Sequence, residues 1–144
     1  DIETAWLIDR GCKVLDDPEL TQKMYVITKD LTAQIYKVAF DGHSLANECD
    51  RGVVNVHRVW WVQAETVIGF LNGYEKDPEK KEYLEAAEKE WAFIRDHVID
   101  KRAGSEWFWE VDPEGNPYPG RPIVEPWKCP YHNGRMCMEV MKRC

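Results

Sequence analysis

The sequence predicts an all-α protein built from helical hairpins. Apolar residues recur every three or four positions over several long segments, and short Asp-Pro or Asp-Gly breaks separate those segments. A long segment rich in glycine and proline, residues 104–130, interrupts the pattern once before a last helix. With 144 residues, 44% of them hydrophobic, the chain is large enough for one ordinary domain, and we expect residues 1–144 to belong to a single one.

The first two helices are predicted over residues 1–15 and 19–40. Asp16-Asp-Pro18 closes the first helix, because proline disfavours helical geometry in the residue before it. Pro18 also suits the first turn of the second helix, which Asp41-Gly42 ends. The second helix is expected to bury one apolar face formed by Leu20, Met24, Ile27, Leu31, Ile35 and Val38.

Short extended pieces and a third helix come next. Residues 44–56 contain a turn around Cys49-Asp-Arg-Gly52, with glycine late in the turn, and this is typical of a small hairpin. A third helix is predicted over residues 57–75, and it carries the adjacent pair Trp60-Trp61 as well as Glu65.

The last part of the chain combines a fourth helix, a long loop and a fifth helix. The fourth helix is predicted over residues 79–100, and its charged positions form a solvated face. Within the loop region, Trp107–Val111 favours a strand, and the fifth helix starts near His132. Helical hairpins with long aromatic loops at one end suit an α/α toroid, whose loop end carries the functional site.

Composition excludes several kinds of partner. A net charge of -7 argues against nucleic acid and anionic membranes, and no run approaches the roughly 18 apolar residues of a membrane-spanning helix. No Gly-rich phosphate loop and no metal-ligand spacing is present, so no cofactor is expected. An odd number of cysteines without a Cys-x-x-Cys pair favours free thiols and a cytoplasmic protein: Cys12, Cys49, Cys129, Cys137 and Cys144.

Two stretches predict a polar, aromatic-walled site for a carbohydrate. In the first, Trp127 lies five residues before His132, and Arg135 follows one helical turn later. An indole can stack on a sugar face, and an imidazole can transfer protons near neutral pH. The second stretch, Arg58–Glu65, adds two adjacent indoles and a carboxylate. One of two adjacent tryptophans on a helix must point away from a shared site.

Three motifs, in this order along the chain, resemble the N-acylglucosamine 2-epimerase family. They are Ile2-Glu3-Thr-Ala-Trp6, Arg58-Val-Trp-Trp-Val-Gln-Ala-Glu65 and Pro126-Trp-Lys-Cys-Pro-Tyr-His-Asn-Gly-Arg-Met136. Ser105-Glu-Trp107 is similar to the family's Gly-Glu-Trp strand. The resemblance covers essentially the whole chain and implies part of an (α/α)6 barrel with sugar epimerase chemistry.

The resemblance also implies roles for particular residues. His132 would be one of two acid/base histidines, and the family pattern places the other immediately before Asp1. Glu3, one turn after that position, would orient its imidazole and is the second catalytic candidate in this chain. The implied substrate-binding residues are Trp60, Trp61, Trp127, Glu65 and Arg135. For Arg135 an ion pair with a carboxylate such as Glu65 is an equally good reading.

The implied reaction is C2 epimerisation of the reducing-end glucose of a β-1,4-linked disaccharide such as cellobiose, through an enediolate. An aldose–ketose isomerase or an N-acylglucosamine 2-epimerase on the same fold is the alternative within this chemistry. A helical fragment that binds sugar without catalysis is the alternative from a different class. Because the chain starts and stops within helical patterns, we expect the N-terminal half of the barrel to be its missing partner, and the isolated segment to be inactive.

Overall fold

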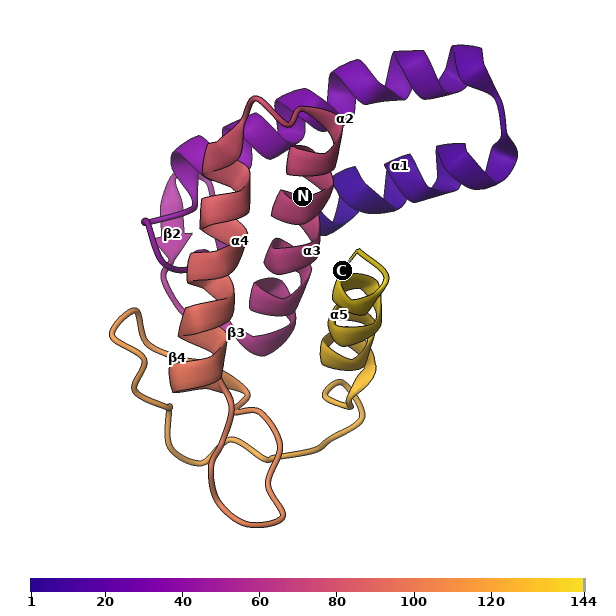
Figure 1. Cartoon of the computed structure of the whole chain (residues 1–144). Coiled ribbons are helices and arrows are strands. Elements are labelled where there is room, and N and C mark those ends of the chain that lie inside the picture. The colour runs from indigo at the N-terminus through magenta and orange to yellow at the C-terminus, as the bar shows by residue number, and fades with distance from the viewer. Residues whose placement is uncertain (144) are drawn as a thin grey trace.

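The computed structural model describes residues 1–143, and helices dominate it (Figure 1). The structure also contains two antiparallel strand pairs, β1 with β2 and β3 with β4. The elements, in chain order, are α1 (Ile2–Leu15), α2 (Pro18–Val38), β1 (Glu48–Asp50), β2 (Val53–Asn55), β3 (Arg58–Val59), α3 (Trp60–Lys76), α4 (Lys81–Phe93), η1 (Ile94–Val98), β4 (Glu110–Val111) and α5 (Tyr131–Met141).

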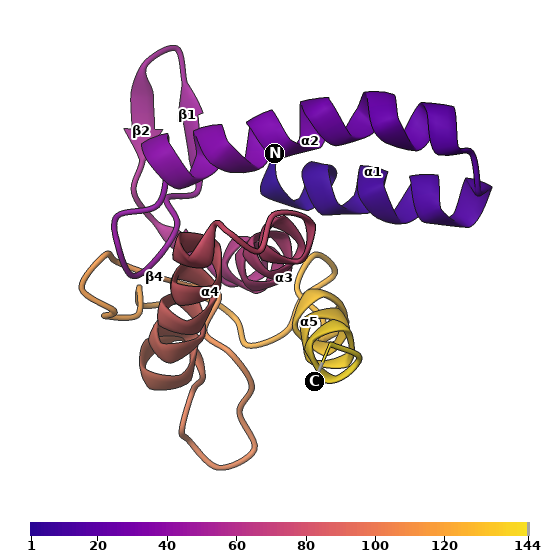
Figure 2. The same cartoon turned by 45° about the horizontal axis from the view of Figure 1, so that its top comes forward.

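The helices form two hairpins and one additional helix, as the sequence predicts. α1 pairs with α2, and α3 pairs with α4, while α5 packs on α3 (Figure 1). α3 is therefore the central helix, in contact with α1, α4 and α5. The β1–β2 hairpin projects beyond the end of α2 (Figure 2). The long loops gather at the end of the molecule where α3 and α5 begin and α4 ends (Figure 1).

The turn between the first two helices forms as the sequence signals predict. Asp16 adopts a left-handed conformation with φ of 53° and closes α1. Asp17 caps α2 by accepting a hydrogen bond of 3.0 Å from the backbone N–H of Leu20. Pro18 occupies the first turn, where its missing N–H leaves no hydrogen bond unmade.

The predicted start of the third helix is wrong by three residues. α3 begins at Trp60, because Arg58 and Val59 pair with Val111 and Glu110 in an antiparallel ladder. The expected strand Trp107–Val111 shrinks accordingly to its last two residues. The paired strands lie about fifty residues apart in the sequence. Helical periodicity depends on near neighbours, so it cannot predict this pairing.

The fourth helix also differs from its predicted form. α4 ends at Phe93, and the chain continues to Val98 as a π-helical segment, η1. Ile94 and Val98 stay fully buried across this change. The apolar spacing that predicts a helix to residue 100 therefore identifies the buried face correctly but misses the change of helix type.

The buried face of α2 matches the predicted apolar one only in part: Ile35 packs against the core, but other predicted positions do not. Ile27 and Val38 are 49% and 72% exposed, whereas Thr28 and Thr32 are buried. The Thr28 hydroxyl donates to Asp9 at 2.8 Å, so this face of α2 joins a buried polar network. Hydrogen-bonded threonines can therefore occupy the buried face in place of the apolar residues.

α1 crosses α3 closely at a glycine. A Cβ built on Gly69 would lie 2.3 Å from Cγ1 of Ile2, so only glycine permits this approach. Gly69 lies one helical turn after Glu65 on α3. The close approach at Gly69 therefore holds Glu3 and Trp6 of α1 beside Glu65. This crossing brings together the first two of the motifs noted in the sequence.

Two further observations concern the lengths of the helices and the state of the cysteines. None of the helices within residues 1–143 is both long enough and apolar enough to cross a membrane. Among these residues, Cys12, Cys49, Cys129 and Cys137 are free thiols, as predicted.

The end of α5 predicts a pH-dependent stability. Arg143 and Lys142 donate to the Glu139 carboxylate at 2.8 and 2.9 Å, and these bonds lower its pKa from 4.5 to about 2. A folded-state pKa below the unfolded one adds stability above pH 4.5 that disappears as the pH falls towards 2. We expect Glu139→Gln to lower the unfolding free energy by about 1–2 kcal/mol at pH 7, after allowance for the exposed Lys142.

Denaturant titration of the full-length protein at pH 7 and pH 3 measures this effect. The difference between wild type and Glu139→Gln should shrink by more than half at the lower pH. The exposed Glu85 provides the control, and Glu85→Gln should change stability little at either pH. A Glu139→Gln deficit of equal size at both pH values would contradict the assignment.

Candidate functional site

His132 lies in the first turn of α5, at the loop end of the molecule. Its Nδ1 is 2.8 Å from Oε1 of Glu65 on α3, and its side chain keeps 21% of its surface exposed. The imidazole lies between two indoles, with ring centroids 5.4 Å from both Trp60 and Trp61. The second and the third of the motifs noted in the sequence thus meet at His132.

The Glu65 carboxylate is the centre of the site and is fully buried. The indole N–H of Trp6 donates to Oε2 at 2.9 Å, and Arg135 donates to Oε1 at 2.7 Å. Both donors lack any acceptor function, so Glu65 accepts at both of its oxygens. His132 then donates from Nδ1, and its Nε2 is left with a lone pair that can accept a proton.

Arg135 joins the carboxylates of Glu65 and Glu3. It donates to both, and Glu3 Oε1 lies 3.9 Å from His132 Nδ1. Burial alone would lower the pKa of Arg135, but its hydrogen bonds to Glu65 and Glu3 outweigh that effect and raise the pKa. A permanent positive charge therefore balances part of the negative charge behind the imidazole.

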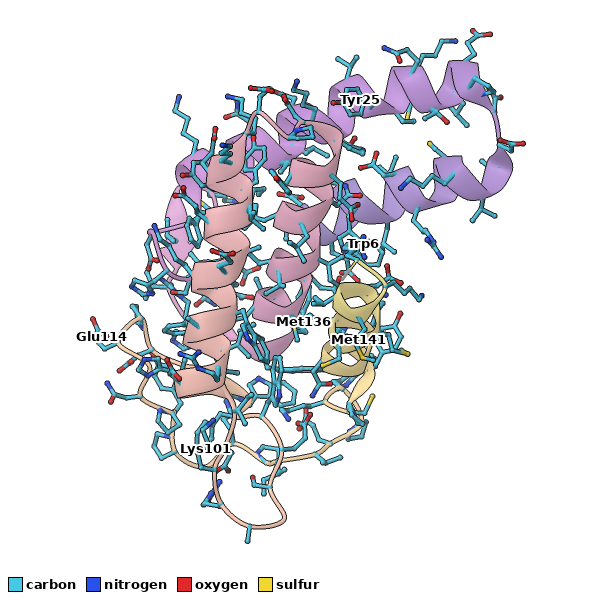
Figure 3. The ribbon with its side chains drawn as sticks, in the orientation of Figure 1. Trp6, Tyr25, Lys101, Glu114, Met136 and Met141 are labelled. Atoms are coloured by element: carbon cyan, nitrogen blue, oxygen red, sulfur yellow. The ribbon has the colours of Figure 1, made fainter. Side chains whose placement is uncertain are left out.

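Trp6 is the first site residue whose role the sequence analysis missed. Besides its bond to Glu65, its ring lies 5.1 Å below the guanidinium carbon of Arg135. Figure 3 shows Trp6 where α1 passes close to α5. Trp6 stands in the first family-like motif, and this position was the one indication in the sequence that it belongs to the site. The motif could not predict that Trp6 would bond Glu65, because Glu65 is 59 residues away in the sequence.

The structure separates the three tryptophans that were expected to bind sugar. Trp61 is 36% exposed beside His132, and Trp127 is 86% exposed at the tip of a loop. Trp60 is only 1% exposed, so the expectation that its ring stacks on a sugar needs correction. Adjacent helical residues point in different directions, and here Trp60 packs inward while Trp61 points outward.

Two further expectations change in the same way. Glu65 has no exposed surface, and its carboxylate bonds His132. Of the two readings of Arg135, the structure shows the ion pair, because its Nη2 bonds both carboxylates. Glu3 lies at the edge of the same cluster with 26% of its side chain exposed.

Glu3, Glu65 and His132 also have the composition of a metal site. One ligand atom from each lies within 4.8 Å of the other two. The guanidinium of Arg135 already bonds both carboxylates from within this cluster. A cation at that position would compete with Arg135 and would meet its positive charge.

A second histidine–glutamate pair stands outside this cluster. His57 Nδ1 is 3.0 Å from the buried Glu110, which also accepts from Arg121 at 2.6 Å. Burial would raise the pKa of Glu110, but these two partners lower it below its ordinary value. Tyr118 stacks on the His57 ring, with centroids 4.3 Å apart. His57 stands at the first position of the helix predicted over residues 57–75, and nothing in the sequence indicates this pairing.

The fold and the site together define a class of protein. Helical hairpins carry a cluster of His132, Glu65 and Arg135 at the end where the long loops gather. The family model for N-acylglucosamine 2-epimerase matches residues 1–133. The chain belongs to this family.

Particular relatives agree with the family assignment. The chain is 51% identical over 142 residues to a cellobiose 2-epimerase of Eubacterium cellulosolvens. A crystal structure of a sugar epimerase from a ruminal bacterium superposes with a TM-score of 0.95 at 44% identity. The structure of the cellobiose 2-epimerase of Bacillus thermoamylovorans B4167 superposes with a TM-score of 0.88 at 42% identity.

These relatives are considerably longer than the chain. Each comparison covers 99% of this chain, but only 35% of the Eubacterium protein and 36% of each of the two structures. The hairpins described here are therefore part of an (α/α)6 barrel, as the sequence resemblance implies.

Proposed function

We propose that the protein to which this chain belongs is a sugar 2-epimerase. It inverts C2 of the reducing-end glucose of a β-1,4-linked disaccharide and so converts cellobiose into glucosyl-mannose. We further propose that residues 1–144 are part of one barrel domain in a cytoplasmic enzyme. The observation that carries the proposal is the His132–Glu65 pair, which leaves a free imidazole nitrogen beside an exposed indole.

The chemistry follows from that nitrogen. The sugar ring first opens, because the aldehyde carbonyl acidifies the C2–H bond. His132 Nε2 takes or gives the C2 proton on one face, and the electron pair left at C2 forms an enediolate with C1. A proton delivered to the opposite face of C2 then produces the epimer. Glu65 and Arg135 hold the imidazole in place as it gains and loses its proton.

The second acid/base is assigned to the histidine that the family motif places ahead of Asp1. Support comes from the start of α1, where Glu3 reaches the same carboxylate–guanidinium cluster as His132. A side chain at the N-terminal end of α1 is therefore close to His132. Two imidazoles on opposite faces of C2 provide both the proton acceptor and the proton donor that inversion requires.

Stacking on exposed indoles is proposed to bind the sugar rings. We expect Trp127→Ala in the full-length enzyme to weaken cellobiose binding by about 1–2 kcal/mol, because the 86% exposed indole loses its contact with a pyranose face. Calorimetric titration with cellobiose measures the change. Trp91→Ala, which removes a 40% exposed indole on α4, is the control and should bind like wild type. Equal affinity of Trp127→Ala and wild type would remove Trp127 from the binding site.

Product analysis of the full-length enzyme tests the proposal. Incubation with cellobiose, with glucose or mannose, and with N-acylglucosamine, followed by chromatography, should show conversion of cellobiose into its C2 epimer. A ketose as the main product would favour the isomerase, and preferred turnover of N-acylglucosamine would favour that epimerase. Sugar binding without any turnover would support the non-catalytic alternative and overturn the proposal.

A further inference from the structure

We propose that Glu106, Lys128 and Asn133 form a positioning clamp that fixes His132 and the Trp127 loop relative to each other. Glu106 links the other two, because its carboxylate accepts from both Lys128 and Asn133. Their catalytic consequence rests on the proposed function, whereas their structural role does not. Glu106 belongs to the Ser105-Glu-Trp107 motif, to which the proposed chemistry gives no part.

Lys128 is the most unusual member of the clamp. Its side chain has no exposed surface, although buried lysines are rare unless they are paired. The ammonium group donates to Glu106 and, at 2.8 Å, to the backbone carbonyl of Ile123. It also lies 5.2 Å from the centre of the Trp60 ring, at the start of α3. One buried charge thus joins the loop to the helix that carries Glu65.

Glu106 uses its two oxygens for two different segments. Oε2 accepts from Lys128, and Oε1 accepts from the side-chain amide of Asn133, the residue directly after His132. Its own backbone is anchored, because the Glu106 carbonyl accepts from the N–H of Asp100 at 2.9 Å. The carboxylate therefore connects the segment after η1 to both the loop and the first turn of α5.

The loop that the clamp holds is small and carries Trp127 at its tip. Glu125 and Lys128 exchange two backbone hydrogen bonds of 3.1 and 3.0 Å, which close the loop around Pro126 and Trp127. Because Lys128 is the last residue of this closed loop, anchoring its ammonium group also fixes the indole. Asn133 and Lys128 then set the separation between the proposed stacking ring and the proposed acid/base.

Loss of the clamp should misplace both groups. Catalytic geometry tolerates shifts of only about 0.5 Å, and a 1 Å misplacement can cost about 10²-fold in rate. The full-length protein with Lys128→Met tests this, because methionine keeps most of the volume and removes the charge. Lys76→Met is the matched control, since Lys76 also forms a partly buried ion pair, with Asp9, in the polar network that includes Thr28.

Two measurements are made on each variant. The first is the kcat and KM for epimerisation of cellobiose, and the second is hydrogen exchange of residues 123–133 followed by mass spectrometry. For Lys128→Met we expect kcat to fall at least tenfold, KM to rise, and exchange in residues 123–133 to accelerate. Lys76→Met should keep both kinetic constants within twofold of wild type and leave residues 123–133 protected.

The outcomes separate the clamp from the proposed function. Wild-type protection of residues 123–133 in Lys128→Met, or a kcat no lower than that of Lys76→Met, would overturn the clamp. A wild-type enzyme that turns over no sugar would overturn the proposed function, and hydrogen exchange alone would then decide the clamp. If Lys128→Met does not fold, Glu106→Gln replaces it. This variant should lower kcat at least threefold with faster exchange, and unchanged values for both would again overturn the clamp.

Discussion

Replacing His132 by alanine in the full-length enzyme is expected to lower proton exchange at C2 of the sugar by about 10²–10⁴-fold. The reason is that His132 supplies the free imidazole nitrogen, since Glu65 occupies its Nδ1 at 2.8 Å. Sugar binding should persist, because the exposed indoles Trp61 and Trp127 stay in place. Exchange of the C2 hydrogen for solvent deuterium, followed by NMR, gives the rate directly.

His97→Ala is the control for this experiment. His97 is exposed on η1 and packs against the Phe93 ring, away from the carboxylate cluster. Its loss should leave exchange at the wild-type rate. A decrease of less than tenfold in His132→Ala would remove His132 from the acid/base role.

Replacing Glu65 by glutamine is expected to have the second largest effect. Trp6, His132 and Arg135 all donate to this one carboxylate, and two of the three can only donate. Glutamine has one acceptor oxygen, so its NH₂ group must face a donor in either orientation. We expect unfolding free energy to fall by about 1–3 kcal/mol and the exchange rate at C2 to fall on the order of 10²-fold.

The chain offers a closely matched control for Glu65→Gln. Glu110 is also buried and also lies between a histidine and an arginine, His57 and Arg121. Glu110→Gln should cost comparable stability but leave proton exchange at C2 within twofold of wild type. If both variants lose catalysis equally, general destabilisation explains the result and Glu65 has no special role.

Sequence periodicity predicted the helices well because each helix depends on contacts between near neighbours. Asp17 and Pro18 mark the start of α2 by local chemistry alone. The start of α3 depends instead on the pairing of Arg58 with Val111, and the buried face of α2 depends on the partner of Thr28. Both are long-range contacts, and neither leaves a periodic signal in the sequence.

The candidate site shows the same division. His132, Glu65 and Arg135 were identifiable as residue types within motifs, but their mutual bonds join positions about 70 residues apart. The sequence offered Trp60 and Trp61 equally as stacking rings, and only the direction of each side chain in the fold distinguishes them. The buried position of Lys128 could not be predicted for a further reason, because a lysine in a loop is usually solvated.

Deuterium labelling during turnover tests the central claim most directly. Wild-type full-length enzyme is incubated with cellobiose in D₂O, and the sugars are analysed by NMR. Proton transfer through solvent-exchangeable imidazoles predicts that the newly formed C2 epimer carries one deuterium at C2 and none at other carbons. An epimer that retains its original hydrogen at C2, or the absence of any epimer, would contradict the account.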